Sequence, residues 1–284
     1  MRFLQRSART TLYLCLCLGL PTWLMTATAQ DEKHKRSPSR PPQIVGHRGL
    51  MHYAPENTLA GFAACIHLRT GFELDVRRTK DGVLVCLHDA EVKRTTNGKG
   101  KVSEFTLAEL QKLDAGQWFD RRFEGERVPT LEAVFALLKK LGIQVLVALD
   151  IKIDDETVEA DIVSLAKKHG VLGQVICIGR AITEPSVRAK LRAADPKVPV
   201  AVLANNAEEV VQALADKNAD WIYVRFVPST EQVRKIHEQG KRVFLSGKLA
   251  AGNEPDNWRR AQEAGVDALL TDFPLECAKH LAQK

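Results

Sequence analysis

The chain has 284 residues, of which 27% are charged and 45% hydrophobic, and its formal net charge is +6 at pH 7. Three arginines and no acidic residues lie within residues 1–29, so removal of that segment lowers the net charge to +3. The other basic residues are spread along the chain instead of forming one tract, which argues against a nucleic-acid-binding protein.

Residues 1–29 have the three-part pattern of a secretory signal peptide. Arginines precede the apolar run TLYLCLCLGLPTWLM, and the small residues of TATAQ place a cleavage site after Ala29. A retained membrane anchor is the alternative, but Pro21 interrupts the run, which is shorter than the ~20 residues that a spanning helix needs. We therefore expect export, to the periplasm or to the medium.

Residues 30–43 are expected to form a disordered leader. Most of this segment, DEKHKRSPSRPPQ, is charged and proline-rich and has no apolar periodicity. No second linker of this composition follows, so residues 44–284 should form one domain that is large enough for a complete core. The cysteines of this domain stand singly, without CxxC spacing, which favours buried free thiols over zinc ligation or disulfides. They are Cys65, Cys86, Cys177 and Cys277.

From Ile44 onward, short β-branched apolar runs alternate with helical stretches. QIVGH precedes the helical ENTLAGFAACIHL, VLVALDI precedes DETVEADIVSLAKKHG, and the alternation continues to ALLTD and LECAKHLA. This alternation predicts βα units and a parallel sheet. An open doubly wound sheet is the alternative, but the first strand-to-helix turn, GHRGLMHYAPEN, lacks the glycine pattern of dinucleotide-binding folds.

One hairpin decides how the strands are counted. Taking FELDV (72–76) and VLVCLH (83–88) separately gives nine strand candidates, one too many for an eightfold barrel. Asp81-Gly82 is a strong signal for a two-residue hairpin turn, so one of the two runs is an addition to the repeat. The predicted fold is therefore α/β, a (β/α)8 TIM barrel with a β-hairpin addition after strand 2.

The hairpin also predicts which side chains share a face. With Asp81 and Gly82 as the central turn residues, Asp75 lies opposite His88. Side chains alternate along a strand, so Glu73 joins that face while its apolar neighbours face the helices. Acids that point into a barrel must be paired or bound to a cation, and a divalent metal with oxygen ligands is the simplest solution. An ordinary solvent-facing side of a hairpin is the alternative.

Polar residues at the carboxyl ends of barrel strands are usually chemical. In PENT, Glu56 and Asn57 either face the same centre or cap the following helix, and Asp272, shortly before Pro274, has the same two interpretations. The further strand-end residues that fit this centre are His47, Arg48, Asp150 and Lys152.

A series of spaced motifs runs through the predicted domain. GHRG, PENT, ELDVRRTKDGVLVCLHD, RTTNGKG, VPTLEAV and GVDALLTDFP occur in this order. Together they resemble the glycerophosphodiester phosphodiesterase family, which folds as a phospholipase-C-like barrel, over the stretch from Ile44 to Pro274. The resemblance implies a metal-dependent hydrolase that cleaves glycerophosphodiesters to glycerol 3-phosphate and an alcohol, with one divalent cation, Mg²⁺ or Ca²⁺.

The resemblance also implies roles for individual residues. His47 and His88 would be the acid/base pair, and we assign His47 as the base and His88 as the acid, since two imidazoles can divide the proton transfers. A cation and fixed positive charges would offset the charge that builds on the phosphoryl oxygens. The implied metal ligands are Glu73, Asp75 and Asp150, and the implied phosphate-binding or supporting residues are Arg48, Asn57 and Lys152.

The chain departs from the family pattern at two positions. Asp150 stands where the family usually has a glutamate, so it reaches about one methylene less far toward a metal. VFLSG (243–247) stands where relatives typically carry a tryptophan. Trp258 either fills that space from a loop or packs in an ordinary helix interface.

Two other functions are compatible with the sequence. One is a phospholipase D-like enzyme that acts on lysophospholipid or sphingolipid headgroups, and the other is a non-catalytic barrel that binds phosphodiesters without turnover. In each case the partner is a small phosphodiester, with transient membrane contact left open. The sequence does not indicate the oligomeric state.

Overall fold

The computed structural model describes residues 41–246 and 252–283, which belong to one compact unit. The predicted signal peptide and most of the predicted leader lie outside the described residues, so both stay predictions. Within the described ranges, no helix is both long and apolar enough to cross a membrane.

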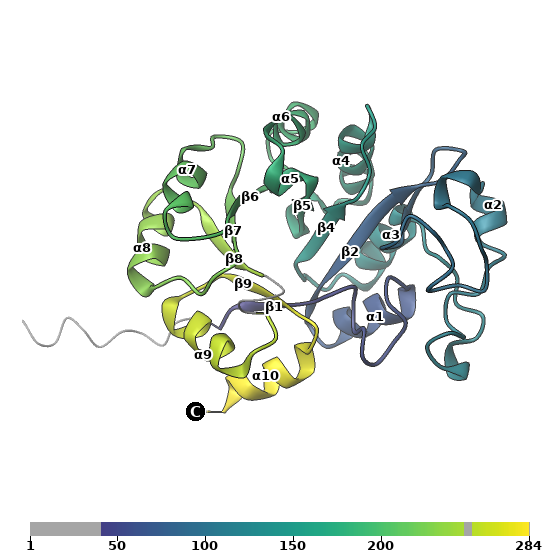
Figure 1. The fold of residues 1–284 in the computed structure, drawn as a ribbon, viewed down its shortest axis with the longest axis horizontal. Helices are drawn as coiled ribbons and strands as arrows, with labels where there is room; N and C mark the ends of the chain where they lie inside the picture. Colours follow the sequence, from purple (N-terminus) through teal and green to yellow (C-terminus); the bar gives the residue numbers. More distant parts are fainter. Residues whose placement is uncertain (1–40, 247–251, 284) are drawn as a thin grey trace, which may run out of the picture. The chain divides into compact units, whose positions relative to one another are not determined.

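Eight parallel strands and one antiparallel strand form a single sheet (Figure 1). The strands are β1 (Gln43–Gly46), β2 (Gly71–Arg78), β3 (Leu84–Cys86), β4 (Val147–Ile151), β5 (Val175–Gly179), β6 (Ala201–Ala204), β7 (Trp221–Val224), β8 (Arg242–Leu245) and β9 (Ala268–Thr271). The parallel strands follow the order β5-β4-β2-β1-β9-β8-β7-β6, and a bridge between Cys177 and Val200 joins the β5 and β6 ends. Strand β3 lies off this order and pairs antiparallel with β2. The predicted barrel with a hairpin addition after strand 2 is confirmed.

Helices follow the strands and cover the outside of the barrel (Figure 1). The α-helices are α1 (Leu59–His67), α2 (Leu107–Leu110), α3 (Leu131–Leu141), α4 (Val158–His169), α5 (Arg180–Thr183), α6 (Pro185–Ala194), α7 (Glu209–Ala215), α8 (Thr230–Glu238), α9 (Pro255–Ala264) and α10 (Pro274–Ala282). Local signals fix their ends: Thr130 caps α3 by accepting a hydrogen bond from the Ala133 N–H, and Gly142 ends it in the left-handed conformation.

The core has an outer and an inner layer. Phe72, Leu74 and Val76 of β2 are fully buried against apolar side chains of α1 and α3 in the outer layer. The intervening Glu73 and Asp75 are also buried and therefore point into the barrel. This inward orientation of the two acids was predicted from the alternation and is confirmed. The four cysteines of the described residues are buried and free, also as predicted.

A segment between β3 and α3 forms an insertion with its own small core. It spans residues 88–130 and carries η2 (Val102–Glu104), α2 and η3 (Arg121–Phe123). Its buried apolar residues pack together and against β3, so the segment is an ordered part of the barrel rim. They include Val92, Val102, Leu110 and Ala115.

The predicted hairpin register is wrong by one residue. Arg77 pairs with Val85, and the Thr79 N–H donates to the Val83 carbonyl at 3.0 Å, so the loop holds three residues and not two. Gly82, with φ +87°, accepts the left-handed conformation that a three-residue loop needs at its last position. Leu87 therefore lies opposite Asp75, and the Leu87 N–H donates to the backbone carbonyl of Asp75 at 3.0 Å.

His88 consequently reaches the barrel by a different route from the predicted one. Strand β3 ends at Cys86, so His88 lies beyond the paired residues. The alternation of side chains along a strand therefore does not determine the direction of the His88 side chain. The guanidinium of Arg77 holds the His88 carbonyl through Nε at 3.0 Å and Nη2 at 2.7 Å.

Candidate active site

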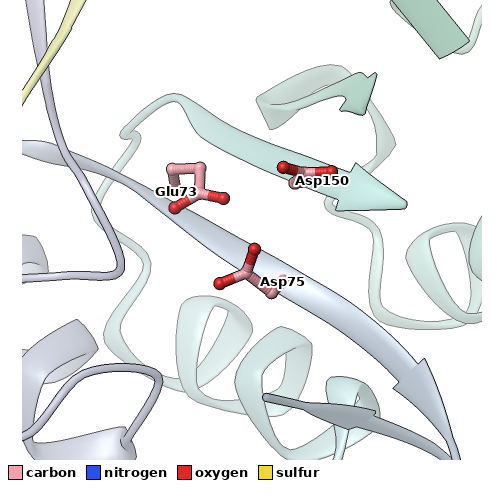
Figure 2. A group of neighbouring side chains, drawn as sticks. All are labelled: Glu73, Asp75 and Asp150. Carbon is pink, nitrogen blue, oxygen red and sulfur yellow. The ribbon is translucent and has the colours of Figure 1, made fainter. Parts of the chain in front are cut away.

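Three carboxylates meet inside the barrel (Figure 2). Glu73 and Asp75 project from β2, and Asp150 projects from β4 directly beside Asp75 in the parallel register. One oxygen from each carboxylate lies within 4.8 Å of the others. On the next strand, a Cβ at Gly179 would stand 2.1 Å from Asp150 Oδ1, so glycine at that position leaves the space that the carboxylate occupies.

The charges of this cluster are costly without compensation. Burial, followed by the charges of Asp75 and Asp150, raises the pKa of Glu73 well above its ordinary value. Burial also raises the pKa of Asp150. Lys152 supplies one compensating charge, because its Nζ lies 2.5 Å from Asp150 Oδ2 and 3.2 Å from Asp75 Oδ1. Arg48 supplies a second, because its Nε lies 3.7 Å from Asp75 Oδ2. Two fixed positive charges do not neutralise three carboxylates, so the cluster favours an added cation.

The donor set fits a divalent metal ion. Asp75 Oδ1 is buried and makes an ion pair with Lys152 Nζ at 3.2 Å but no hydrogen bond with the described residues, although buried polar atoms are nearly always satisfied. Hard divalent cations prefer carboxylate oxygens, and three such groups converge here. Glu73, Asp75 and Asp150 are therefore the residues that could hold the ion, and the asparagine and lysine around them could hold the carboxylates in place.

The loop between β1 and α1 fixes two of the predicted site residues in the left-handed region. Arg48 has φ 54° and Asn57 has φ 56°. The Arg48 N–H donates to Glu73 Oε2 at 2.9 Å. Asn57 donates from Nδ2 to Asp75 Oδ2 at 2.8 Å and accepts from the Asp75 N–H at 3.1 Å. These contacts with the acids stabilise both residues in a backbone conformation that is unfavourable for residues other than glycine.

Helix capping does not explain PENT. Thr58 caps α1, because its hydroxyl accepts a hydrogen bond from the Gly61 N–H at 3.3 Å. Asn57 is bound to Asp75 instead, and Glu56 accepts a hydrogen bond from Arg48 Nη1 at 3.1 Å. Of the two interpretations that the sequence left open for Glu56 and Asn57, the structure therefore supports the one that faces the site.

Both predicted histidines form a pair with a carboxylate through Nδ1. His47 Nδ1 lies 2.7 Å from Asp272 Oδ1, and His88 Nδ1 lies 2.7 Å from Asp89 Oδ1. The hydrogen bond from His47 lowers the pKa of Asp272, and a hydrogen bond from Arg94 lowers that of Asp89. An ionised carboxylate only accepts, so each Nδ1 carries the proton and each Nε2 is free to take or give one.

Both histidines lie within electrostatic reach of the acidic cluster. His47 Nε2 stands 3.9 Å from Glu73 Oε2. The charge of His88 opposes the upward shift that burial causes in the pKa of Asp150, so His88 lies within electrostatic reach of that carboxylate. The structure thus brings together the predicted site residues, which are His47, Arg48, Asn57, Glu73, Asp75, His88, Asp150 and Lys152.

Comparison with known proteins identifies the family of the chain that carries these residues. The model of the glycerophosphoryl diester phosphodiesterase family matches residues 47–276, a range that contains every predicted site residue. The chain belongs to this family. Its glycerophosphodiester phosphodiesterase relative from Caldanaerobacter subterraneus subsp. tengcongensis is 34% identical over 238 residues, which are 81% of this chain and 94% of the relative. The predicted family and the class of phosphoric diester hydrolase are confirmed.

Solved structures agree with this family assignment. The glycerophosphodiester phosphodiesterase from Agrobacterium tumefaciens str. C58 superposes with a TM-score of 0.68 at 28% identity, over 84% of this chain and 99% of that chain. An Oleispira antarctica phosphodiesterase, solved in complex with the product sn-glycerol-3-phosphate, shares the fold with a TM-score of 0.67 at 23% identity, over 84% of this chain and 96% of that chain.

Two residues beside the site of this family member were not predicted from the sequence. Tyr223 of β7 faces the acids from across the barrel, and burial raises its pKa to about 12, with the charges of Glu73 and Asp150 acting in the same direction. Its strand reads WIYV, which carries no polar pattern. Asp89, by contrast, directly follows His88 in the sequence, and that adjacency is a signal that could have identified it.

The two interpretations of Trp258 are also resolved. Its side chain is buried in the helix-facing core, and its Nε1 donates to the Gly252 carbonyl at 2.8 Å. Trp258 therefore packs α9 and does not replace the tryptophan that VFLSG lacks. Phe244 of that segment instead fills the barrel interior, with its ring 5.4 Å from the ring of Tyr223.

Proposed function

We propose that this chain hydrolyses glycerophosphodiesters to glycerol 3-phosphate and an alcohol, with the acid and base roles carried by His47 and His88. The observation that carries the proposal is that two histidines with carboxylate-bound Nδ1 atoms accompany a cluster of three acids, of which Glu73 and Asp75 are buried. Relatives named as glycerophosphodiester phosphodiesterases support the substrate class.

The proposed proton transfers follow from the free Nε2 atoms. His47 accepts a proton from the attacking oxygen, which belongs to water or to a hydroxyl of the substrate. His88, as an imidazolium, gives a proton to the leaving alkoxide, so one proton is taken up and one is released in each displacement. The ionised partners Asp272 and Asp89 stabilise the imidazolium form that each ring adopts in its half of the cycle.

A divalent cation, Mg²⁺ or Ca²⁺, held by Glu73, Asp75 and Asp150 would polarise the phosphoryl oxygens. Arg48 is proposed to bind the phosphate. Its Nε is buried and has no hydrogen-bond acceptor among the described residues, although Asp75 Oδ2 is 3.7 Å away. Lys152 adds positive charge on the Asp150 side of the cluster, and Asn57 holds Asp75 in position.

An assay over a panel of phosphodiesters tests this function. Glycerophosphocholine and glycerophosphoethanolamine should release glycerol 3-phosphate, detected with a coupled dehydrogenase, and the release should require a divalent cation. Lysophosphatidylcholine and sphingomyelin serve as the comparison substrates. Faster release of choline from those lipids would replace the proposed substrate class with lipid headgroups, and tight binding of all diesters without product would make the barrel a binding protein.

We also propose that the protein acts outside the cytoplasm. The support is the signal-peptide pattern of residues 1–29 and its cleavage motif. Diesters of glycerol released from membrane lipids are the substrates that such a location would offer, and transient contact with a membrane surface stays a prediction.

A further inference from the structure

One guanidinium joins the two loops that carry the site. Arg94, in the insertion, donates to Asp89 from Nε at 2.7 Å and from Nη2 at 3.1 Å. The same side chain donates to Glu56 from Nη1 and from Nη2, both at 2.8 Å. Each carboxylate is thus held in a two-point contact, a geometry that the planar fork of arginine provides and an ammonium does not.

Both partners of Arg94 are in turn bound to predicted site residues. Asp89 holds His88 through Nδ1, and Glu56, which is almost fully buried, accepts a hydrogen bond from Arg48 Nη1. A continuous series of charged hydrogen bonds therefore leads from His88 through Asp89, Arg94 and Glu56 to Arg48. Its two ends belong to segments that follow different strands, β3 and β1.

The backbone around Arg94 is anchored by the insertion. Val92 is fully buried in the insertion core, and its N–H donates to the Gly100 carbonyl at 3.0 Å. The Thr96 hydroxyl donates to the Val92 carbonyl at 2.7 Å. The insertion thus presents Arg94 from a fixed support, which is what a residue needs if it is to set the distance between two loops.

We propose that Arg94 is a positioning residue that fixes His88 relative to Arg48 through Asp89 and Glu56 and contacts no reacting atom. The proposal rests on the proposed function, in which His88 protonates the leaving group and Arg48 binds the phosphate. It also gives the insertion a role, since the insertion core holds Arg94 in place. Loss of the guanidinium leaves Asp89 in contact with His88 alone and Glu56 in contact with Arg48 alone. The carboxylates of Asp89 and Glu56 can then move, and His88 and Arg48 move with them.

The kinetic test compares Arg94→Met and Arg94→Lys with wild type on glycerophosphocholine. Arg94→Met should lower kcat roughly 10–100-fold with KM changed by less than about 3-fold, because misplacement of a proton donor slows the chemical step more than it weakens binding. Arg94→Lys should recover only part of the loss, and about 20 mM guanidinium should raise the turnover of Arg94→Met. The matched control is Arg122→Met, which removes an exposed arginine of the same insertion that pairs with Asp120, and it should behave as wild type.

A double-mutant comparison separates positioning from direct contact. If Arg94 acts through Asp89, Arg94→Met should cost at most about 2-fold in an Asp89→Asn background, because the two changes break one series of contacts. A rise in KM at constant kcat, or full additivity with Asp89→Asn, would mean that Arg94 binds the substrate directly and would overturn the proposal.

A spectroscopic readout does not depend on turnover. Nitrogen-15 shifts of the histidine rings should show the Nδ1–H tautomer for His88 in wild type and a mixture of tautomers in Arg94→Met. His47 is the internal control, because its partner Asp272 makes no contact with Arg94, so its tautomer should not change. An unchanged His88 tautomer in Arg94→Met refutes the inference. Failure of wild type and Arg122→Met to hydrolyse any diester refutes the proposed function instead.

Discussion

His47 Nδ1 and Asp272 Oδ1 lie 2.7 Å apart although 225 positions separate them in the chain. Strands β1 and β9 are neighbours in the barrel, with Gly46 beside Thr271, so the residue that follows each strand meets the other at the barrel mouth. Asp272 therefore orients the imidazole and does not cap α10, whose N-cap position is Phe273.

Asp272→Asn is expected to lower kcat by roughly 10²-fold or more, because an amide can donate to Nδ1 and so place the proton on Nε2, where a base needs a lone pair. Steady-state kinetics on glycerophosphocholine measure the effect. Asp267→Asn is the matched control, since Asp267 forms a similar pair with His237 outside the site. The two side chains of that pair are 2.8 Å apart. Equal losses in the two variants would indicate a general structural effect.

His88→Ala is expected to lower turnover by roughly 10²–10⁴-fold while the melting temperature changes little, because this side chain is one-third exposed and contributes little to packing. His237→Ala, which removes an exposed histidine of α8, should retain full turnover. Hydrolysis by His88→Ala at the wild-type rate would remove His88 from the mechanism.

Removal of divalent ions with EDTA is expected to abolish hydrolysis, and Mg²⁺ or Ca²⁺ should restore it, because the three clustered acids need a compensating cation. Calorimetry should show binding of the ion to wild type and little binding to Asp75→Asn. The control is Asp155→Asn, which alters a carboxylate that pairs with Arg78 outside the cluster. Full activity in excess EDTA would exclude a metal from the reaction.

The stability contributed by Asp89 is expected to depend on pH. Hydrogen bonds from Arg94 and then from His88 lower the pKa of Asp89 below its ordinary value of 3.8, against the effect of burial. The native state therefore binds fewer protons than the unfolded state, so the contribution is complete above pH 3.8 and is lost as the pH falls toward the native pKa. Melting curves should show Asp89→Asn below wild type near neutral pH, and the gap should close below pH 3.8. A gap of constant size would contradict the shift.

Expression in a host with a secretory pathway is expected to yield a mature chain that begins at Gln30, because the cleavage motif ends at Ala29. Mass spectrometry of the N-terminal peptide measures this. Ala29→Arg should block cleavage, whereas Arg40→Ala, in the predicted leader, should leave it unchanged. An intact N-terminus in the exported wild type would favour the retained anchor.

Much of the site was predictable because local patterns carry it. The alternation in FELDV requires Glu73 and Asp75 to face away from Phe72 and Leu74, and the barrel buries that apolar face against helices. The hairpin register was not predictable to the residue, since Asp-Gly serves both two-residue and three-residue loops, and only the packing of β3 selects between them.

The sequence by itself determined the barrel, the inward acids and the motif residues, because periodicity and turn chemistry act between neighbours in the chain. Only the tertiary structure decided that Asp272 orients His47, that Arg94 joins Asp89 to Glu56, and that Tyr223 faces the acids from across the barrel. Those relationships depend on which strands become neighbours when the sheet closes. No pattern of local spacing encodes a contact between side chains that meet only after closure.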